Sequence, residues 1–227
     1  MMKKKPPIKT FAVLLVSLFT GVWGYQFITN YQTEKEVLKE MVQRLNAESR
    51  VGEVLVTGVN YDEKKKKTLT TIKFLEYDVD GNPVEPKYFT FAGNIIQFQA
   101  LVVRFNDIQL RSADQLSGKS AYIFWKVFML DGKDTQEFEI TPMNHIPKGY
   151  KVPGLEDPYE EYVWKQFWDY ALNPEAARKE NIKNAQIEAP GSMFIPGYLY
   201  TIKIEHDGGL RIDASPISPI LKGEKIL

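Results

Sequence analysis

The chain has 227 residues, with 29 basic and 29 acidic side chains, 44% hydrophobic residues and no cysteine. The lack of cysteine excludes disulfides, thiolate nucleophiles and zinc-thiolate sites, and the balanced charge gives no reason to expect nucleic acid as a partner. The roughly 175 residues beyond the N-terminal segments are enough for one domain that is held by its own core.

The N-terminal 29 residues combine a basic head, residues 1–10, with an uncharged run, residues 11–29. As a helix rising about 1.5 Å per residue, the run reaches roughly the 30 Å of a bilayer's hydrocarbon core. Trp23 and Tyr25 fall where aromatic rings favour the membrane interface. We therefore expect one transmembrane anchor in the inner (cytoplasmic) membrane, with a cytoplasmic head and a periplasmic or extracellular body. A signal peptide cleaved after Gly24 is the alternative, and it also exports the body.

Residues 30–50 read as a helical stem that follows the anchor. Leu38, Met41, Val42 and Leu45 recur at three- and four-residue spacing on one side of this helix. A free helix of this length is marginal in water, so the stem docks on the body, continues the membrane helix or pairs with copies of itself as a coiled coil. A plain spacer and a self-association segment both fit the pattern.

Residues 51–214 are expected to form one exported domain that is mainly β, an antiparallel sandwich or a partly closed barrel. Period-two runs rich in Val, Ile, Thr, Phe and Tyr alternate with turn residues, and the pairs Asp80-Gly81, Asp131-Gly132 and Asp207-Gly208 are typical of tight hairpins. Residues 121–130 (AYIFWKVFML) are apolar on both faces apart from one lysine, which predicts a central strand. The expected strands span 54–60, 68–78, 84–92, 95–105, 120–130, 135–140, 197–206 and 209–213.

A helical hairpin over residues 157–185 is predicted to interrupt the strands. Asp157 precedes Pro158 at a helix start, and Asn173-Pro174 repeats the signal for a second helix that runs to about Asn184. Trp164, Phe167 and Trp168 share one face of the first helix, which either packs on the sheet or binds a partner or ligand. Residues 215–227 read as a tail.

Two short motifs and the two histidines have a simpler structural explanation. Residues 113–120 fit a degenerate phosphate-loop pattern, but a strand is expected after them where a phosphate loop needs a helix. Residues 78–82 resemble the start of a calcium loop with its glycine misplaced, so a hairpin turn is the better interpretation. His145 and His206 lack the spacing of a zinc site, and we interpret both as structural or surface residues.

These patterns identify no catalytic, cofactor-binding or metal-binding residue. The leading expectation is a non-enzymatic accessory or scaffold subunit of a larger membrane complex, whose partners are the membrane, other envelope proteins and copies of itself. A second hypothesis is a module that binds a small ligand or glycan through aromatics such as Tyr198, Tyr200 and Trp164. A third is a hydrolase whose carboxylates, for example Asp107, Glu188 and Asp207, converge only in the fold.

Overall fold

The computed structural model describes the chain in two compact units, Met1–Glu40 and Met41–Leu227. The residues that it describes are 19–26, 28–29, 32, 52–64, 66–78, 80–105, 120–131, 134–151, 158–180, 182–204 and 209–219.

In the first unit, the described residues are helical and carry exposed apolar side chains. Phe19, Trp23 and Tyr25 are 73%, 69% and 72% exposed. Within the described ranges, no helix has both the length and the apolar character needed to cross a bilayer. The predicted anchor is described only in part, because residues 11–18 and 27 lie outside these ranges, as do the head and all of the stem except Gln32.

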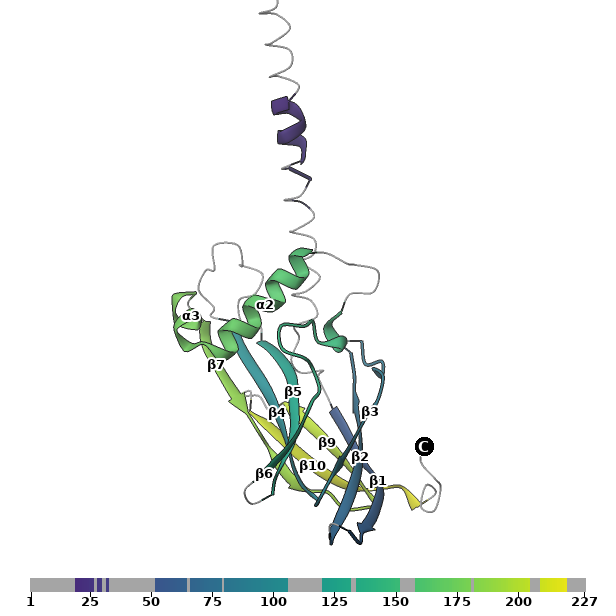
Figure 1. Ribbon diagram of the computed structural model, residues 1–227. Helices are drawn as coiled ribbons and strands as arrows, with labels where there is room; N and C mark the ends of the chain where they lie inside the picture. The colour runs from purple at the N-terminus through teal and green to yellow at the C-terminus, as the bar shows by residue number, and fades with distance from the viewer. Residues whose placement is uncertain are drawn as a thin grey trace, which may run out of the picture. The chain divides into compact units, whose positions relative to one another are not determined.

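The second unit contains two antiparallel sheets, which confirms the mainly β prediction (Figure 1). The first sheet has the order β10 (Leu210–Pro216), β9 (Tyr198–Ile204), β1 (Gly52–Asp62), β2 (Lys67–Glu76) and β3 (Lys87–Phe91). The second has the order β6 (Asp134–Glu139), β5 (Ser120–Asp131), β4 (Ile95–Phe105) and β7 (Ile182–Glu188), with the short β8 (Gly191–Met193) also paired to β4.

The strand pairing follows the turn residues seen in the sequence. β5 and β6 pair as far as Asp131 and Asp134, and β9 and β10 pair from Ile204 and Leu210, so two Asp-Gly pairs lie between hydrogen-bonded partners. The third lies in the β2–β3 connection, which an isolated bridge between Tyr77 and Pro83 closes. β5 lies between β6 and β4, as expected for a central strand with two apolar faces.

The core lies between the two sheets, which pack face to face in a sandwich-like arrangement. Phe74 of β2 and Phe98 of β4 meet at a ring centroid distance of 5.3 Å, and Phe98 also contacts Phe194 at 5.9 Å. Buried and less buried residues alternate along β1 and β2, because one face of each of these strands points into the core. The buried members of this core are Val54, Val56, Ile72, Phe74, Phe89, Phe91, Ile96, Phe98, Ala100, Phe124, Val127, Met129, Ile140, Phe194, Tyr200 and Ile202.

Two helices, α2 (Pro158–Leu172) and α3 (Pro174–Lys179), pack against the second sheet. α2 contacts β4 and β7 at the upper end of the strands in Figure 1. Its Trp168 meets Trp125 of β5 edge to face, with ring centroids 6.0 Å apart. The side chain of Asn173 accepts hydrogen bonds from the backbone N–H groups of Glu175 and Ala176, which confirms the predicted cap of the second helix.

The C-terminal half departs from the predicted boundaries in two places. The second helix ends at Lys179 rather than near Asn184, and residues 182–188 form β7, which pairs with β4. The segment IKNAQIE has no strong local strand signal, so its pairing depends on a strand about eighty residues earlier in the chain. Ser215 and Pro216, assigned to the tail, instead complete β10 against Leu199 and Tyr198.

Candidate functional site

The edge strands of the two sheets, β3 and β6, meet along a seam that polar contacts bridge. In its centre, Phe138 of β6 packs against Phe89 and Phe91 of β3, with ring centroids 5.5 and 5.2 Å away. The backbone N–H of Ala92 donates to Gln136 Oε1 at 3.0 Å. Each end of the seam has a cavity whose wall includes a lysine that reaches the second sheet or the segment after it.

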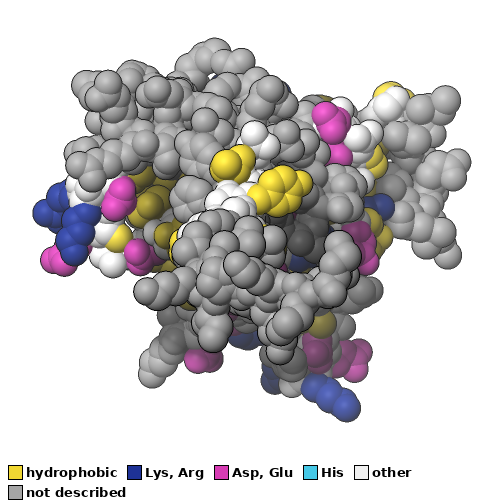
Figure 2. All heavy atoms as spheres, turned by 90° about the horizontal axis from the view of Figure 1, so that it is seen from above, with side chains coloured by type: hydrophobic (Ala, Val, Ile, Leu, Met, Phe, Trp, Pro, Cys, Tyr) yellow, Lys and Arg dark blue, Asp and Glu magenta, His cyan; other side chains and the backbone are white. Residues whose placement is uncertain are grey.

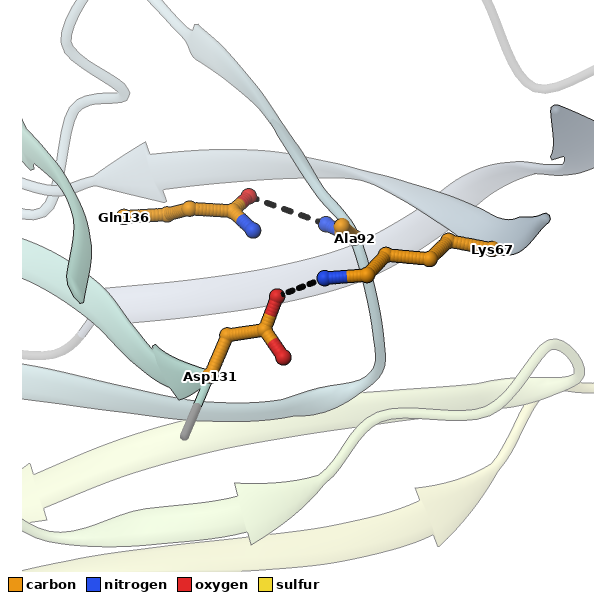
Figure 3. A network of polar contacts seen from close by, with 4 residues as sticks. All are labelled: Lys67, Ala92, Asp131 and Gln136. Carbon is orange, nitrogen blue, oxygen red and sulfur yellow. Dashed lines mark hydrogen bonds and ion pairs between the residues drawn. The ribbon is translucent and has the colours of Figure 1, made fainter. Parts of the chain in front are cut away.

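The first cavity, here called the Asp131 cavity, has a volume of about 660 Å³. Lys67 of β2 forms an ion pair with Asp131 of β5, beside the Ala92–Gln136 hydrogen bond (Figure 3). Asp131 and Asp134 are cross-strand partners, so two carboxylates border the same cavity. Its lining residues are Lys67, Leu69, Thr90, Ala92, Asp131, Asp134 and Gln136.

Two neighbouring carboxylates could in principle serve in hydrolysis, where one acts as acid and the other as base or nucleophile. The half-exposed Lys67, however, already neutralises Asp131, and the ion pair is partly open to solvent. Of the three carboxylates proposed for a hydrolase, Glu188 is on β7 and does not line this cavity, whereas Asp107 and Asp207 fall outside the described residues.

The second cavity, here called the Lys87 cavity, is smaller and more apolar, with a volume of about 230 Å³. It lies where β2 ends and β3 begins, against the segment that follows β6. Lys87 donates a hydrogen bond from its ammonium group to the carbonyl oxygen of Ile140. Burial lowers the pKa of Lys87 below its usual range, the nearby Lys148 lowers it further, and Glu85 opposes both effects. The lining residues are Phe74, Glu76, Val84, Glu85, Lys87, Ile140, Thr141, Pro142, His145, Ile146 and Lys148.

Two long-range contacts hold the outer wall of the Lys87 cavity. Lys148, in the 3₁₀ helix η2 (Lys148–Tyr150), forms an ion pair with Glu85 at 2.6 Å, and its hydrogen bond and charge lower the pKa of that carboxyl group. Trp168 of α2 donates its indole N–H to the carbonyl oxygen of His145 at 2.9 Å. The helix layer therefore positions the loop that closes the cavity.

The predicted aromatic face is in the interior. Trp164, Phe167 and Trp168 are 1%, 2% and 0% exposed. Trp164 packs on Tyr150 at a centroid distance of 4.8 Å, and the Tyr150 hydroxyl accepts a hydrogen bond from the backbone N–H of Tyr122. These side chains join α2 and η2 to the sheet and are not available as an exposed partner surface.

The aromatics named for glycan binding line neither cavity. Tyr200 is 2% exposed, and its hydroxyl group accepts from the N–H of Ile195 and donates to the carbonyl of Met193. Trp164 is buried, as stated above, and Tyr198 packs beside Tyr200 at 6.4 Å between ring centroids. The structure therefore does not bring Tyr198, Tyr200 and Trp164 together in a pocket.

The remaining motifs behave as structural elements where they are described. Ser120 begins strand β5, so a strand follows the phosphate-loop-like segment. The Asp78 carboxylate accepts from the backbone N–H groups of Asp80 and Asn82, as a turn residue does. His145 contacts the carbonyl of Met143 within its loop. Across the described residues, no group of three or more His, Asp or Glu side chains is placed to hold a metal ion.

The structure does not describe the stem residues proposed for self-association, nor the second histidine: Leu38, Met41, Val42, Leu45 and His206.

On the face seen in Figure 2, acidic and basic side chains of the described residues are interspersed at the periphery. Such a mixture of signs does not favour a polyanion as partner.

Sequence reasoning did not single out Lys87. The sequence pattern that could have identified Lys87 is a charged residue at an inward position of an alternating strand, since Lys87, Phe89 and Phe91 share one face of β3.

Comparisons with protein-family models, with curated proteins and with solved structures give no match. No residue role is therefore carried over from a relative.

Proposed function

We propose that this protein is a membrane-anchored accessory or scaffold subunit of the cell envelope, non-enzymatic, with its β domain on the outer side of the inner membrane. The observation that carries the proposal is the uncharged run at 11–29, long enough for a bilayer's hydrocarbon core. The exposed rings of Phe19, Trp23 and Tyr25 support it, because a helix with large apolar side chains in water needs a membrane or protein to cover them.

Membrane fractionation tests the anchor. We expect the full-length chain to stay in the membrane pellet through high salt and alkaline carbonate and to leave it only in detergent. The matched variant replaces Leu14 and Leu18 with arginine, which costs roughly 2.5–3.5 kcal/mol per residue near the centre of a span, and it should lose membrane insertion. A wild-type mature chain that begins at Tyr25 in the soluble fraction would contradict the proposal.

The stem is proposed as the self-association segment. Anchored copies are parallel and confined to two dimensions, which raises their effective concentration, so that a weak helix–helix interface is enough for association. Replacing both Leu38 and Leu45 with glutamate should abolish crosslinked dimers or larger rings while the chain stays folded and inserted. The double variant Glu40→Gln, Lys39→Gln is the control, because it changes stem residues outside the proposed helix–helix interface. Equal crosslinking of wild type and double mutant would make the stem a spacer.

A second candidate function is a module for a small ligand. The Lys87 cavity favours it, because this cavity is concave, mostly apolar and supplied with a few polar groups. Tyr200 and Trp164, two of the aromatic residues first considered for such a role, are buried, and none of the three lines this cavity, so the candidate site proposed here differs from the one expected from the sequence.

A further inference from the structure

We propose that the Lys87 cavity binds a small monocarboxylate with an apolar body, held by its carboxylate on the Lys87 ammonium group. This proposal deepens the second candidate function and does not depend on membrane anchoring. It rests on the position of one cation, on the chemistry of the cavity walls and on the volume that they enclose.

Within the described part of the chain, the Lys87 ammonium group has only one hydrogen-bond acceptor. A lysine ammonium group has three hydrogen-bond donors, and the contact of Lys87 with the Ile140 carbonyl uses one of them. Among the described residues, no carboxylate lies within ion-pairing distance of Lys87, while Glu85 is paired with Lys148 instead. A half-buried cation without a counterion is costly, so an anion that enters the cavity gains a charge-assisted hydrogen bond.

The walls determine what the rest of the ligand can be. Phe74, Val84 and Ile140 supply apolar surface, which suits an aliphatic or aromatic body. Glu76 and Glu85 also line the cavity. A ligand with a second negative charge would meet these carboxylates at close range, so a monoanion fits better than a dicarboxylate or a polyphosphate.

The volume limits the size of the ligand. An engineered apolar cavity of about 150 Å³ holds a benzene molecule, and the Lys87 cavity measures about 230 Å³. The difference leaves room for one or two carbons and a carboxylate. Phenylacetate, a benzene ring with such a substituent, is therefore a suitable probe, and phenylacetamide is its neutral analogue of nearly the same shape.

The competing explanation is that Lys87 only ties β3 to the segment after β6. In that case phenylacetate and phenylacetamide bind equally, or neither binds. Ligand-observed NMR and titration calorimetry on the full-length chain, at millimolar probe concentrations, separate the two explanations. We expect saturable binding of phenylacetate, at least about tenfold tighter than phenylacetamide, because a hydrogen bond to a charged group is worth about that ratio or more.

Three variants complete the test. Lys87→Met keeps the apolar stem and removes the charge, so it should weaken phenylacetate binding at least about tenfold. Lys73→Met is the control. Lys73 of β2 pairs with Tyr88, the residue after Lys87, and lies on the opposite face of the same sheet, so its replacement should leave the affinity for phenylacetate unchanged. Ile146→Trp fills the cavity and should abolish binding.

No saturable phenylacetate binding, equal affinity for the two probes, or full affinity in Lys87→Met would each overturn the proposal. If Lys87→Met does not fold, the comparison of the two probes on wild type decides. None of these results alters the outcome of membrane fractionation, so failure of the ligand site and failure of the anchor are distinguishable.

Discussion

Replacing Trp168 with alanine is expected to destabilise the domain by about 3–5 kcal/mol, the usual cost of removing a fully buried aromatic side chain. Trp168 is 0% exposed and meets Trp125 edge to face. The change also removes the N–H that binds the His145 carbonyl. For a domain of this size, the loss corresponds to a fall in Tm of roughly 6–20 °C, measured by circular dichroism or calorimetry.

Two matched variants show where this effect comes from. Tyr162→Ala removes an aromatic ring from the same helix, but this side chain is 57% exposed, so Tm should change by no more than a few degrees. Trp168→Phe keeps a ring and loses the hydrogen bond, which should cost less than alanine. Equal Tm values for Trp168→Ala and Tyr162→Ala would show that α2 does not pack on the sheet in solution.

Replacing Phe98 with alanine is the second change with a large expected effect. Phe98 is 0% exposed and contacts Phe74 of the first sheet and Phe194 after β8. Its removal leaves a cavity between the two sheets, so we expect a loss of about 3–5 kcal/mol. The free energy of unfolding of a typical domain is only about 5–15 kcal/mol. If the wild type lies at the lower end of this range, the variant should be largely unfolded near 37 °C.

Phe138→Ala is the control for the core. Phe138 is 39% exposed and closes the seam from the edge strand β6. Its truncation removes contacts with Phe89 and Phe91 but leaves a site that water can enter, so we expect a smaller loss, about 1 kcal/mol. Urea unfolding measures both free energies. A loss for Phe138→Ala as large as that for Phe98→Ala would mean that the core extends to the seam.

The stretches predicted correctly from the sequence are those whose structure depends on near neighbours. Alternation along 197–206 matches β9, where Tyr200 and Ile202 are buried and Lys203 is exposed. Asn173 caps α3 through amide groups two and three residues away. The two apolar faces of residues 121–130 indicate a central strand, because each face of β5 meets a different layer, the other sheet on one side and α2 on the other.

By itself, then, the sequence determined the β class, the hairpin turns and the two helix starts, because local periodicity and turn chemistry govern them. Only the tertiary structure decided that residues 182–188 form β7, since β4 supplies their hydrogen bonds. It also decided the seam, where Lys67 and Asp131 meet across 64 residues and Lys87 reaches Ile140 across 53. Such contacts arise when two sheets pack face to face, and no spacing within either segment encodes them.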